Sequence, residues 1–122
     1  VDISAVGLAK LGKAVPSARL VVRDLELEPV LPRGPYALVA CFHYRQPSLW
    51  PAMVAVLEAG GILVAEVMTV KNLERHTHPS HRWLAETGEL VEAAAGLEIL
   101  VDEDGWFEGQ HCARLIARKK WG

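Results

Sequence analysis

The sequence predicts an α/β fold, in which helices on both faces of a mostly parallel sheet make three layers and the last two strands form an antiparallel hairpin. Strand-like apolar runs alternate with helix-like segments, which is typical of this class. Two of the runs, Tyr36–Phe42 and Ile62–Met68, are nearly continuous apolar and so resemble strands buried on both faces of a parallel sheet. No helix fits between the last two strand-like segments. At 122 residues the chain is expected to form a single domain, 1–122.

A strand end and a capped helix are predicted to open the chain. Val1-Asp2-Ile3-Ser4 ends in a hydroxyl that can accept a hydrogen bond from the first helical turn, and Pro16 ends the helix. A β-branched run over Ala18–Val22 then predicts a strand that closes at Arg23-Asp24. One face of the predicted helix is apolar: Leu8, Leu11 and Val15.

Two buried strands are predicted in the middle of the chain, the first of them central, with a helix between them. The first is Tyr36–Phe42 and the second is Ile62–Met68, a segment interpreted as fully apolar. The helix is predicted to begin near Ser48 and to stop at Gly60-Gly61, because glycine accepts the left-handed geometry of a helix end. Its apolar stripe is Leu49, Met53, Val56 and Leu57.

The last third predicts a loop, a helix and a hairpin. A polar loop covers Lys71 to about Arg82, and Thr87 is the predicted cap of a helix that Gly96 ends. The strands Leu97–Asp102 and His111–Arg118 then form the hairpin. The expected turn residues are Asp104-Gly105 and Glu108-Gly109-Gln110.

Composition excludes several classes of protein. Thirteen Lys and Arg against 15 Asp and Glu give no field that favours nucleic acid or an anionic membrane. The apolar runs are far shorter than the roughly 20 residues that span a bilayer. Two cysteines in apolar segments, Cys41 and Cys112, and the lack of a signal sequence predict a reducing, cytoplasmic location. The first residue is Val rather than Met, which suggests a processed or trimmed start.

Four segments resemble the class I S-adenosylmethionine-dependent methyltransferases, whose fold is a Rossmann-like sheet with an antiparallel last strand. Each segment matches the end of one of the family's strands or the turn that leads into one. Within the family, the run from Tyr36 to Val70 and the ending Gly109 to Lys119 most resemble the small tellurite-resistance-type and related uncharacterised methyltransferases. The four segments are Val1-Asp2-Ile3-Ser4, Arg23-Asp24-Leu25, Tyr36–Tyr44 and Leu57-Glu58-Ala59-Gly60-Gly61-Ile62-Leu63.

The resemblance implies that S-adenosylmethionine is the cofactor and assigns four residues to it. Asp2 would accept hydrogen bonds from the two ribose hydroxyls, and Ile3 would pack on adenine. Asp24 and the backbone amide of Leu25 would hold the adenine amino group and a ring nitrogen. Ligands of open α/β sheets lie outside the carboxyl ends of the strands, which agrees with these positions.

The resemblance also places residues at the end of the Tyr36–Phe42 strand. Cys41 and Phe42 would contact the cofactor, and the loop that follows would face a small-molecule acceptor. His43 is a candidate for proton transfer because an imidazole titrates near neutral pH, and Tyr44 is the second catalytic candidate. A general base is needed only if the acceptor must lose a proton.

One family feature is absent from the sequence. The glycine-rich loop that should precede the ribose-binding acid is missing, since no two glycines are separated by a single residue. We therefore expect an N-terminally incomplete domain that lacks the family's first strand. In the family that strand lies beside the one that Tyr36–Phe42 resembles, so self-association through an unpaired strand edge is expected.

Other interpretations of the same residues stay open. Asp2 is also a favourable helix-start residue, and Asp24 a favourable turn residue. His76, His78 and His81 are close enough to suggest a metal site, but their spacing matches no zinc pattern, so no metal site is predicted. The segment from His76 to Trp83 is interpreted instead as a mobile lid.

Two other functions compete with methyl transfer. A nicotinamide-dependent oxidoreductase also carries an acid at the end of its second strand. Against it, Tyr36 and Tyr44 lack the lysine four residues later that short-chain dehydrogenases require. The second alternative is a non-catalytic Rossmann-like fragment.

Overall fold

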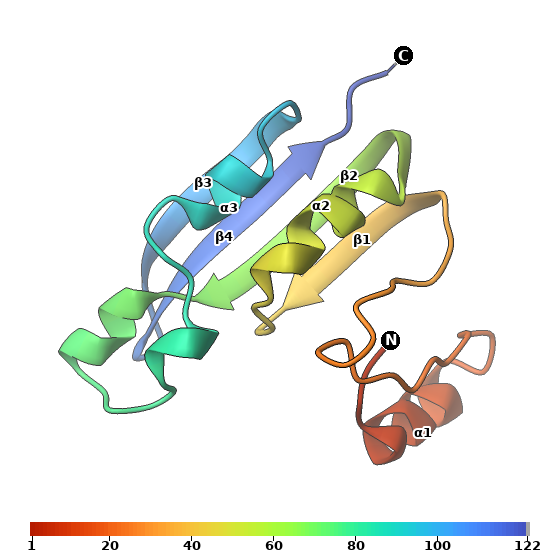
Figure 1. Ribbon diagram of the computed structural model, residues 1–122, viewed down its shortest axis with the longest axis horizontal. Helices are drawn as coiled ribbons and strands as arrows, with labels where there is room; N and C mark the ends of the chain where they lie inside the picture. Colours follow the sequence, from red (N-terminus) through yellow and green to blue (C-terminus); the bar gives the residue numbers. More distant parts are fainter. Residues whose placement is uncertain (122) are drawn as a thin grey trace. The chain divides into compact units, whose positions relative to one another are not determined.

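The computed structural model describes residues 1–121, and the chain consists of two compact units, Val1–Arg33 and Gly34–Gly122 (Figure 1). Gly122, which the predicted domain range includes, lies outside the described residues. The single domain expected from the sequence stays a prediction. None of the helices within residues 1–121 is long and apolar enough to cross a membrane.

The first unit contains one helix, α1 (Ala5–Ala14), and Ser4 caps it as predicted. The Ser4 hydroxyl accepts a hydrogen bond from the Gly7 amide at 3.0 Å. Of the predicted apolar face, Leu8 is buried, whereas Leu11 and Val15 are each 44% exposed. The apolar face of α1 is therefore only partly covered.

The strand predicted over Ala18–Val22 is reduced to a single parallel bridge between Val22 and Asp2. The Asp2 amide donates to the Val21 carbonyl at 3.1 Å, and the Arg23 amide donates to the Asp2 carbonyl at 2.8 Å. The prediction of a full strand was wrong, because Ser4 already caps α1 and the partner segment is too short to extend the ladder.

The second unit contains a mixed four-stranded sheet in the order β1-β2-β4-β3. Its strands are β1 (Tyr36–Phe42), β2 (Leu57–Met68), β3 (Glu98–Phe107) and β4 (Gln110–Arg118). β1 and β2 are parallel, whereas β2–β4 and β4–β3 are antiparallel. The α/β class and the C-terminal hairpin are confirmed, but the sheet of this unit is mixed rather than mostly parallel.

One face of the sheet is covered by two short helices, α2 (Trp50–Ala55) and α3 (Glu89–Ala93), which Figure 1 shows in front of it. On β2, Leu63 and Ala65 are each 1% exposed, and they pair with Ala117 and Leu115 on β4. The connecting segments contain three 3-10 helices: η1 (Pro47–Leu49), η2 (Val70–Glu74) and η3 (His81–Trp83).

β1 lies at the edge of this sheet with one side unpaired, which was expected where the family's first strand is absent, but the prediction that it is buried on both faces was wrong for the described residues. Only β2 pairs with it in the sheet. Leu38 and Phe42, which point to the face away from the buried Cys41, are 58% and 55% exposed. Within β1 only Cys41 is buried, so one face is partly covered and the other is open.

Gly60-Gly61 does not end the helix, because α2 stops at Ala55 and both glycines lie within β2. Gly60 has φ +79°, and a Cβ there would overlap the Trp121 ring. The register between β1 and β2 shifts beside this bend, between Tyr36 and Leu38. The glycine pair thus serves a bulge at the start of the strand.

Two further predictions were wrong, one of a turn and one of a helix cap. The chain does not turn at Asp104-Gly105, since β3 continues to Phe107 and Gly105 pairs with Cys112. The hairpin turn is Glu108-Gly109, with φ of 51° and 84°, the geometry that matches the twist of two-residue hairpins. Thr87 does not cap α3; Gly88 occupies that position in a left-handed conformation.

Candidate functional site

The residues predicted to bind the cofactor divide between the two units. In the first unit, the bridge between Asp2 and Val22 aligns two extended segments in parallel. Asp2 lies in one segment and Asp24 comes two residues after Val22 in the other. The two carboxylates therefore belong to adjacent chain segments that run in the same direction.

Each of these carboxylates makes a local hydrogen bond. Asp2 Oδ1 accepts from the Ser4 amide at 2.9 Å, and Asp24 Oδ1 accepts from the Glu26 amide at 2.9 Å. These are the helix-start and turn roles that the sequence also allowed. A carboxylate has two oxygens with about four lone-pair sites, so this role leaves capacity for a ligand. Ile3, beside Asp2, is 64% exposed.

The other predicted residues follow one another at the carboxyl end of β1. Cys41 is buried, and its thiol donates to the Tyr44 carbonyl at 3.3 Å. Burial raises the pKa of Cys41 to about 11, so the thiol stays protonated at neutral pH. Phe42 is exposed. The Tyr44 hydroxyl donates to Gln46 Oε1 at 2.5 Å.

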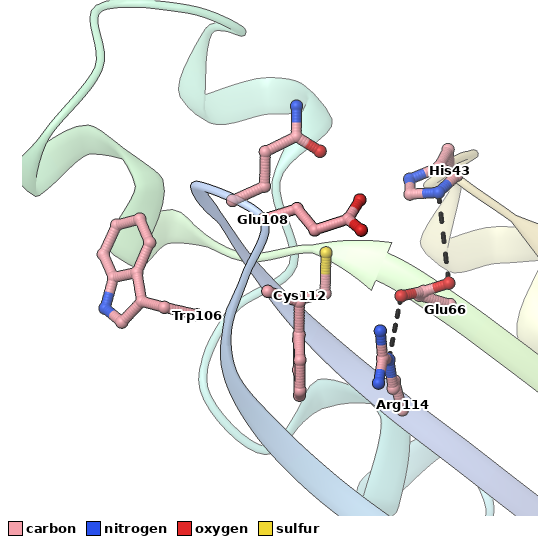
Figure 2. Close-up of a pocket in the computed structure, with 8 residues that line it drawn as sticks. His43, Glu66, Trp106, Glu108, Cys112 and Arg114 are labelled. Atoms are coloured by element: carbon pink, nitrogen blue, oxygen red, sulfur yellow. Dashed lines mark hydrogen bonds and ion pairs between the residues drawn. The ribbon is translucent and has the colours of Figure 1, made fainter.

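A hollow of about 760 Å³ lies beside the carboxyl ends of β1 and β2 (Figure 2). Of the predicted residues only His43 lines it; Tyr44 does not. His43 follows β1, Glu66 lies on β2, and Arg114 lies on β4. The full lining is His43, Glu66, Trp106, Phe107, Glu108, Gln110, Cys112 and Arg114.

Glu66 is the centre of the charged groups in this hollow. Its Oε1 accepts a hydrogen bond from Arg114 Nε at 2.9 Å, and its Oε2 lies 4.0 Å from His43 Nε2. Figure 2 shows His43 and Arg114 on either side of the Glu66 carboxylate. Arg114 also lies 3.6 Å from Glu103 and stacks 3.6 Å from the centre of the Phe107 ring. Arg114 thus fixes the carboxylate that faces His43.

The aromatic side of the hollow is held by a buried polar network. His111 is 3% exposed, and its Nδ1 lies 2.6 Å from Thr69 Oγ1. The Asn72 side chain donates to the His111 carbonyl at 2.7 Å and accepts from the His111 amide at 2.9 Å. Trp106 meets His111 edge to face at 5.3 Å, and Arg75 covers the Trp106 ring at 3.8 Å. This network ties the end of β2 to the start of β4 and positions Trp106.

The histidines of the predicted lid make separate contacts. His76 Nε2 lies 2.8 Å from the Gly109 carbonyl, and His81 Nε2 lies 2.8 Å from Glu86 Oε1. Within residues 1–121 no group of three or more His, Cys, Asp or Glu side chains is placed to hold a metal ion. The mobility of this segment stays a prediction.

Sequence reasoning missed Glu66 and Arg114. Ile62–Met68 was interpreted as fully apolar although Glu66 lies within it, and a carboxylate in a buried strand needs a partner. Arg114 pairs with Glu66 across the β2–β4 ladder. The acid inside an otherwise apolar strand was the signal that pointed to this site.

No protein-family model matches this chain, and no curated protein matches it. Solved structures do. TehB from Haemophilus influenzae has a TM-score of 0.71 at 16% identity, over 93% of this chain and 45% of TehB. The N-methyltransferase NodS from Bradyrhizobium japonicum WM9, in complex with S-adenosyl-L-homocysteine, has a TM-score of 0.70 at 13% identity, over 97% of this chain and 64% of NodS.

The [4+2]-cyclase SpnF has the same fold, with a TM-score of 0.67 at 16% identity, over 98% of this chain and 64% of SpnF. The chain therefore spans between about half and two thirds of these proteins. At these identities the likeness shows the fold, which this chain shares with an N-methyltransferase and with a cyclase.

Proposed function

We propose that this chain is the later part of an S-adenosylmethionine-dependent methyltransferase domain, of the small tellurite-resistance type or a related one. The observation that carries the proposal is the fold it shares with NodS, an N-methyltransferase crystallised with S-adenosyl-L-homocysteine, over 97% of this chain. The glycine-rich loop is absent from these 122 residues. The proposal therefore concerns a parent protein in which the loop is supplied.

The first unit supports a cofactor role for two acids. Asp2 and Asp24 belong to adjacent parallel segments, and one carboxylate oxygen of each accepts a local hydrogen bond. A carboxylate that faces two vicinal hydroxyls can accept two charge-assisted hydrogen bonds, which are stronger than neutral ones. We assign Asp2 to the ribose, with Ile3 on the adenine ring. Asp24 and the Leu25 amide take the adenine edge.

In the second unit, we assign Cys41 and Phe42 to the cofactor and His43 to the acceptor. The cofactor supplies an activated methyl group bound to a sulfonium sulfur. The chain's own residues have two tasks, which are to hold the acceptor in line with that methyl group and to accept a proton where the acceptor carries one. Cys41 and Cys112 remain thiols because burial raises the pKa of both.

Fold likeness alone leaves other reactions open, since SpnF has this fold and is a [4+2]-cyclase. The oxidoreductase and the non-catalytic fragment also remain alternatives. Cofactor binding separates the methyltransferase, the oxidoreductase and the non-catalytic fragment from one another. A methyltransferase binds S-adenosyl-L-homocysteine, an oxidoreductase binds NAD, and a non-catalytic fragment binds neither.

The test is isothermal titration of the parent protein with S-adenosyl-L-homocysteine and with NAD. Asp2→Ala should weaken binding of S-adenosyl-L-homocysteine by roughly ten- to a hundredfold, because hydrogen bonds to a charged group contribute about 1.5–3 kcal/mol. Asp102→Ala, which removes an exposed acid from β3, is the matched control and should leave the affinity unchanged. An affinity that Asp2→Ala does not alter would discard the ribose assignment.

A further inference from the structure

The hollow lies where an acceptor would have to sit. His43 directly follows Cys41 and Phe42, which we assign to the cofactor, and Glu66 lies opposite Phe42 in the parallel ladder. The hollow is therefore at the carboxyl edge of β1 and β2, the edge at which ligands of such sheets bind. Its walls offer both charged groups and aromatic rings (Figure 2).

The lining of the hollow carries more negative than positive charge. Arg114 is the cation of the lining, and it already pairs with Glu66 at 2.9 Å and with Glu103 at 3.6 Å. Glu108 adds another carboxylate to the lining. The thiol of Cys112 is affected accordingly: burial raises its pKa most, and Glu66 raises it further than Arg114 lowers it. A cation fits this lining better than an anion does.

The backbone of His43 is held in an unusual conformation. Its φ is +56°, a left-handed geometry that costs most side chains energy but that histidine adopts more often than most. The His43 amide donates to the Glu66 carbonyl at 2.7 Å, which fixes the residue beside β2. Strained backbone of this kind concentrates at functional sites. The imidazole is thereby placed beside the Glu66 carboxylate, with Nε2 4.0 Å from Oε2, in the lining of the hollow.

We propose that this hollow takes the methyl acceptor as a small primary or secondary amine, with Glu66 attracting the ammonium form and His43 removing a proton from it. This inference rests on the proposed methyl transfer. One N–H proton passes to an imidazole nitrogen of His43, which frees the nitrogen lone pair. That pair forms the new bond to the methyl carbon as the carbon–sulfur bond breaks, and the sulfur keeps the bonding pair and becomes a neutral thioether. The proton on His43 then passes to solvent.

The first test measures binding without cofactor or turnover. Butylamine, butanol and butyrate have the same carbon chain and differ in charge at pH 7. In NMR titrations of the full chain, only butylamine should shift the ring signals of His43 and the Nε–H signal of Arg114. Equal shifts with butanol or with butyrate would overturn the choice of an amine.

Charge-matched variants locate the binding group. Glu66→Gln should weaken butylamine binding by roughly three- to tenfold. Glu98→Gln makes the same charge change at the opposite end of the hairpin, where Glu98 pairs with Arg118 at 3.8 Å, and should leave binding unchanged. An equal loss in both variants would show that net charge rather than this hollow attracts the amine, and would overturn the proposal.

The second test addresses His43 in the parent enzyme. His43→Gly removes the imidazole while keeping a residue that accepts φ +56° without strain. With butylamine as acceptor, kcat should fall by roughly a hundredfold or more, with KM for the amine little changed. Added imidazole should restore part of kcat in the variant and leave the unsubstituted enzyme unaffected. Unchanged kcat, or lost kcat that imidazole does not restore, would overturn the role of His43.

The two proposals fail in different ways. A parent protein that does not bind S-adenosyl-L-homocysteine contradicts methyl transfer itself. A protein that binds it but shows no preference for butylamine contradicts only the amine acceptor.

Discussion

β1 and β2 have the same kind of sequence and different surroundings. Both contain long apolar runs, and both were predicted to be buried strands. β2 pairs on both sides and alternates buried with half-buried residues, whereas β1 pairs on one side and leaves Leu38 and Phe42 exposed. The apolar sequence of a strand therefore indicates that its side chains favour burial. It does not indicate whether other parts of this chain bury them.

The largest effect should come from truncating matching leucines on the two strands. Leu63→Ala on β2, at a side chain 1% exposed, should lower the free energy of unfolding by about 2–5 kcal/mol in urea denaturation, because it leaves a cavity. Leu38→Ala on β1, at a side chain 58% exposed, should cost less than about 1 kcal/mol.

A loss at Leu38 as large as that at Leu63 would show that β1 is covered in solution. Light scattering would then show whether a second copy of the chain supplies this cover, as a mass above that of one chain. Leu38→Lys, which places a charge on the edge strand, should return the chain to a monomer.

An intermediate effect should come from the ion pair that anchors the loop after β1. Arg45 Nε donates to Glu89 Oε2 at 3.0 Å, and Trp50 Nε1 donates to the same oxygen at 3.3 Å. Burial raises the pKa of Glu89, but hydrogen bonds from Arg45, the Glu86 amide and Trp50 outweigh it and hold the pKa below its ordinary 4.5. A carboxyl with a lowered pKa stabilises the fold above its ordinary pKa, and this contribution is lost as pH falls below 4.5 through the folded value.

Glu89→Gln should therefore cost about 2 kcal/mol at pH 7. The difference from the unsubstituted chain should shrink as pH falls below 4.5, measured by urea denaturation across pH. Glu86→Gln, which removes an exposed pair with His81, is the control and should cost less than about 0.5 kcal/mol. A constant difference between pH 3 and pH 7 would rule out the Glu89 charge as the cause.

The smallest effect should come from the bend at the start of β2. Gly60 and Gly88 both have φ +79°, but only Gly60 faces the Trp121 ring. Gly60→Ala and Gly88→Ala should each cost about 1 kcal/mol in thermal unfolding, for the left-handed backbone. Trp121 is 77% exposed and free to move away, so the extra cost at Gly60 should be small. A much larger loss at Gly60 would show that Trp121 is held there.

The sequence predicted strands and helices well where side-chain periodicity determines them. β1, the end of β2, the Ser4 cap and the hairpin pairing were all expected. Some of the errors lie at glycines, because a glycine pair such as Gly60-Gly61 fits a helix end and a strand bulge equally well. Asp104-Gly105 also resembles a turn, but its pairing with β4 depends on residues far along the chain.

The candidate site shows the same division. His43 could be named from its place after an apolar strand, but its neighbours Glu66 and Arg114 come together only through the antiparallel ladder of β2 with β4. Register between distant strands is set by packing of the whole sheet, and no local pattern around Arg114 specifies it. The location of the hollow could therefore be predicted from the sequence, but the side chains that line it could not.

The strand order has a consequence for how this chain is made. β4 lies between β2 and β3, so of these four strands the one that is synthesised last joins two that do not pair with each other. At about 5–20 residues per second, the growing chain leaves one backbone edge of β2 unpaired for seconds before β4 exists. A stop codon at the start of β4 would leave both β2 and β3 without this partner, whereas a stop codon near its end would remove only the pairs that Ala117 and Arg118 make with β2 and β3.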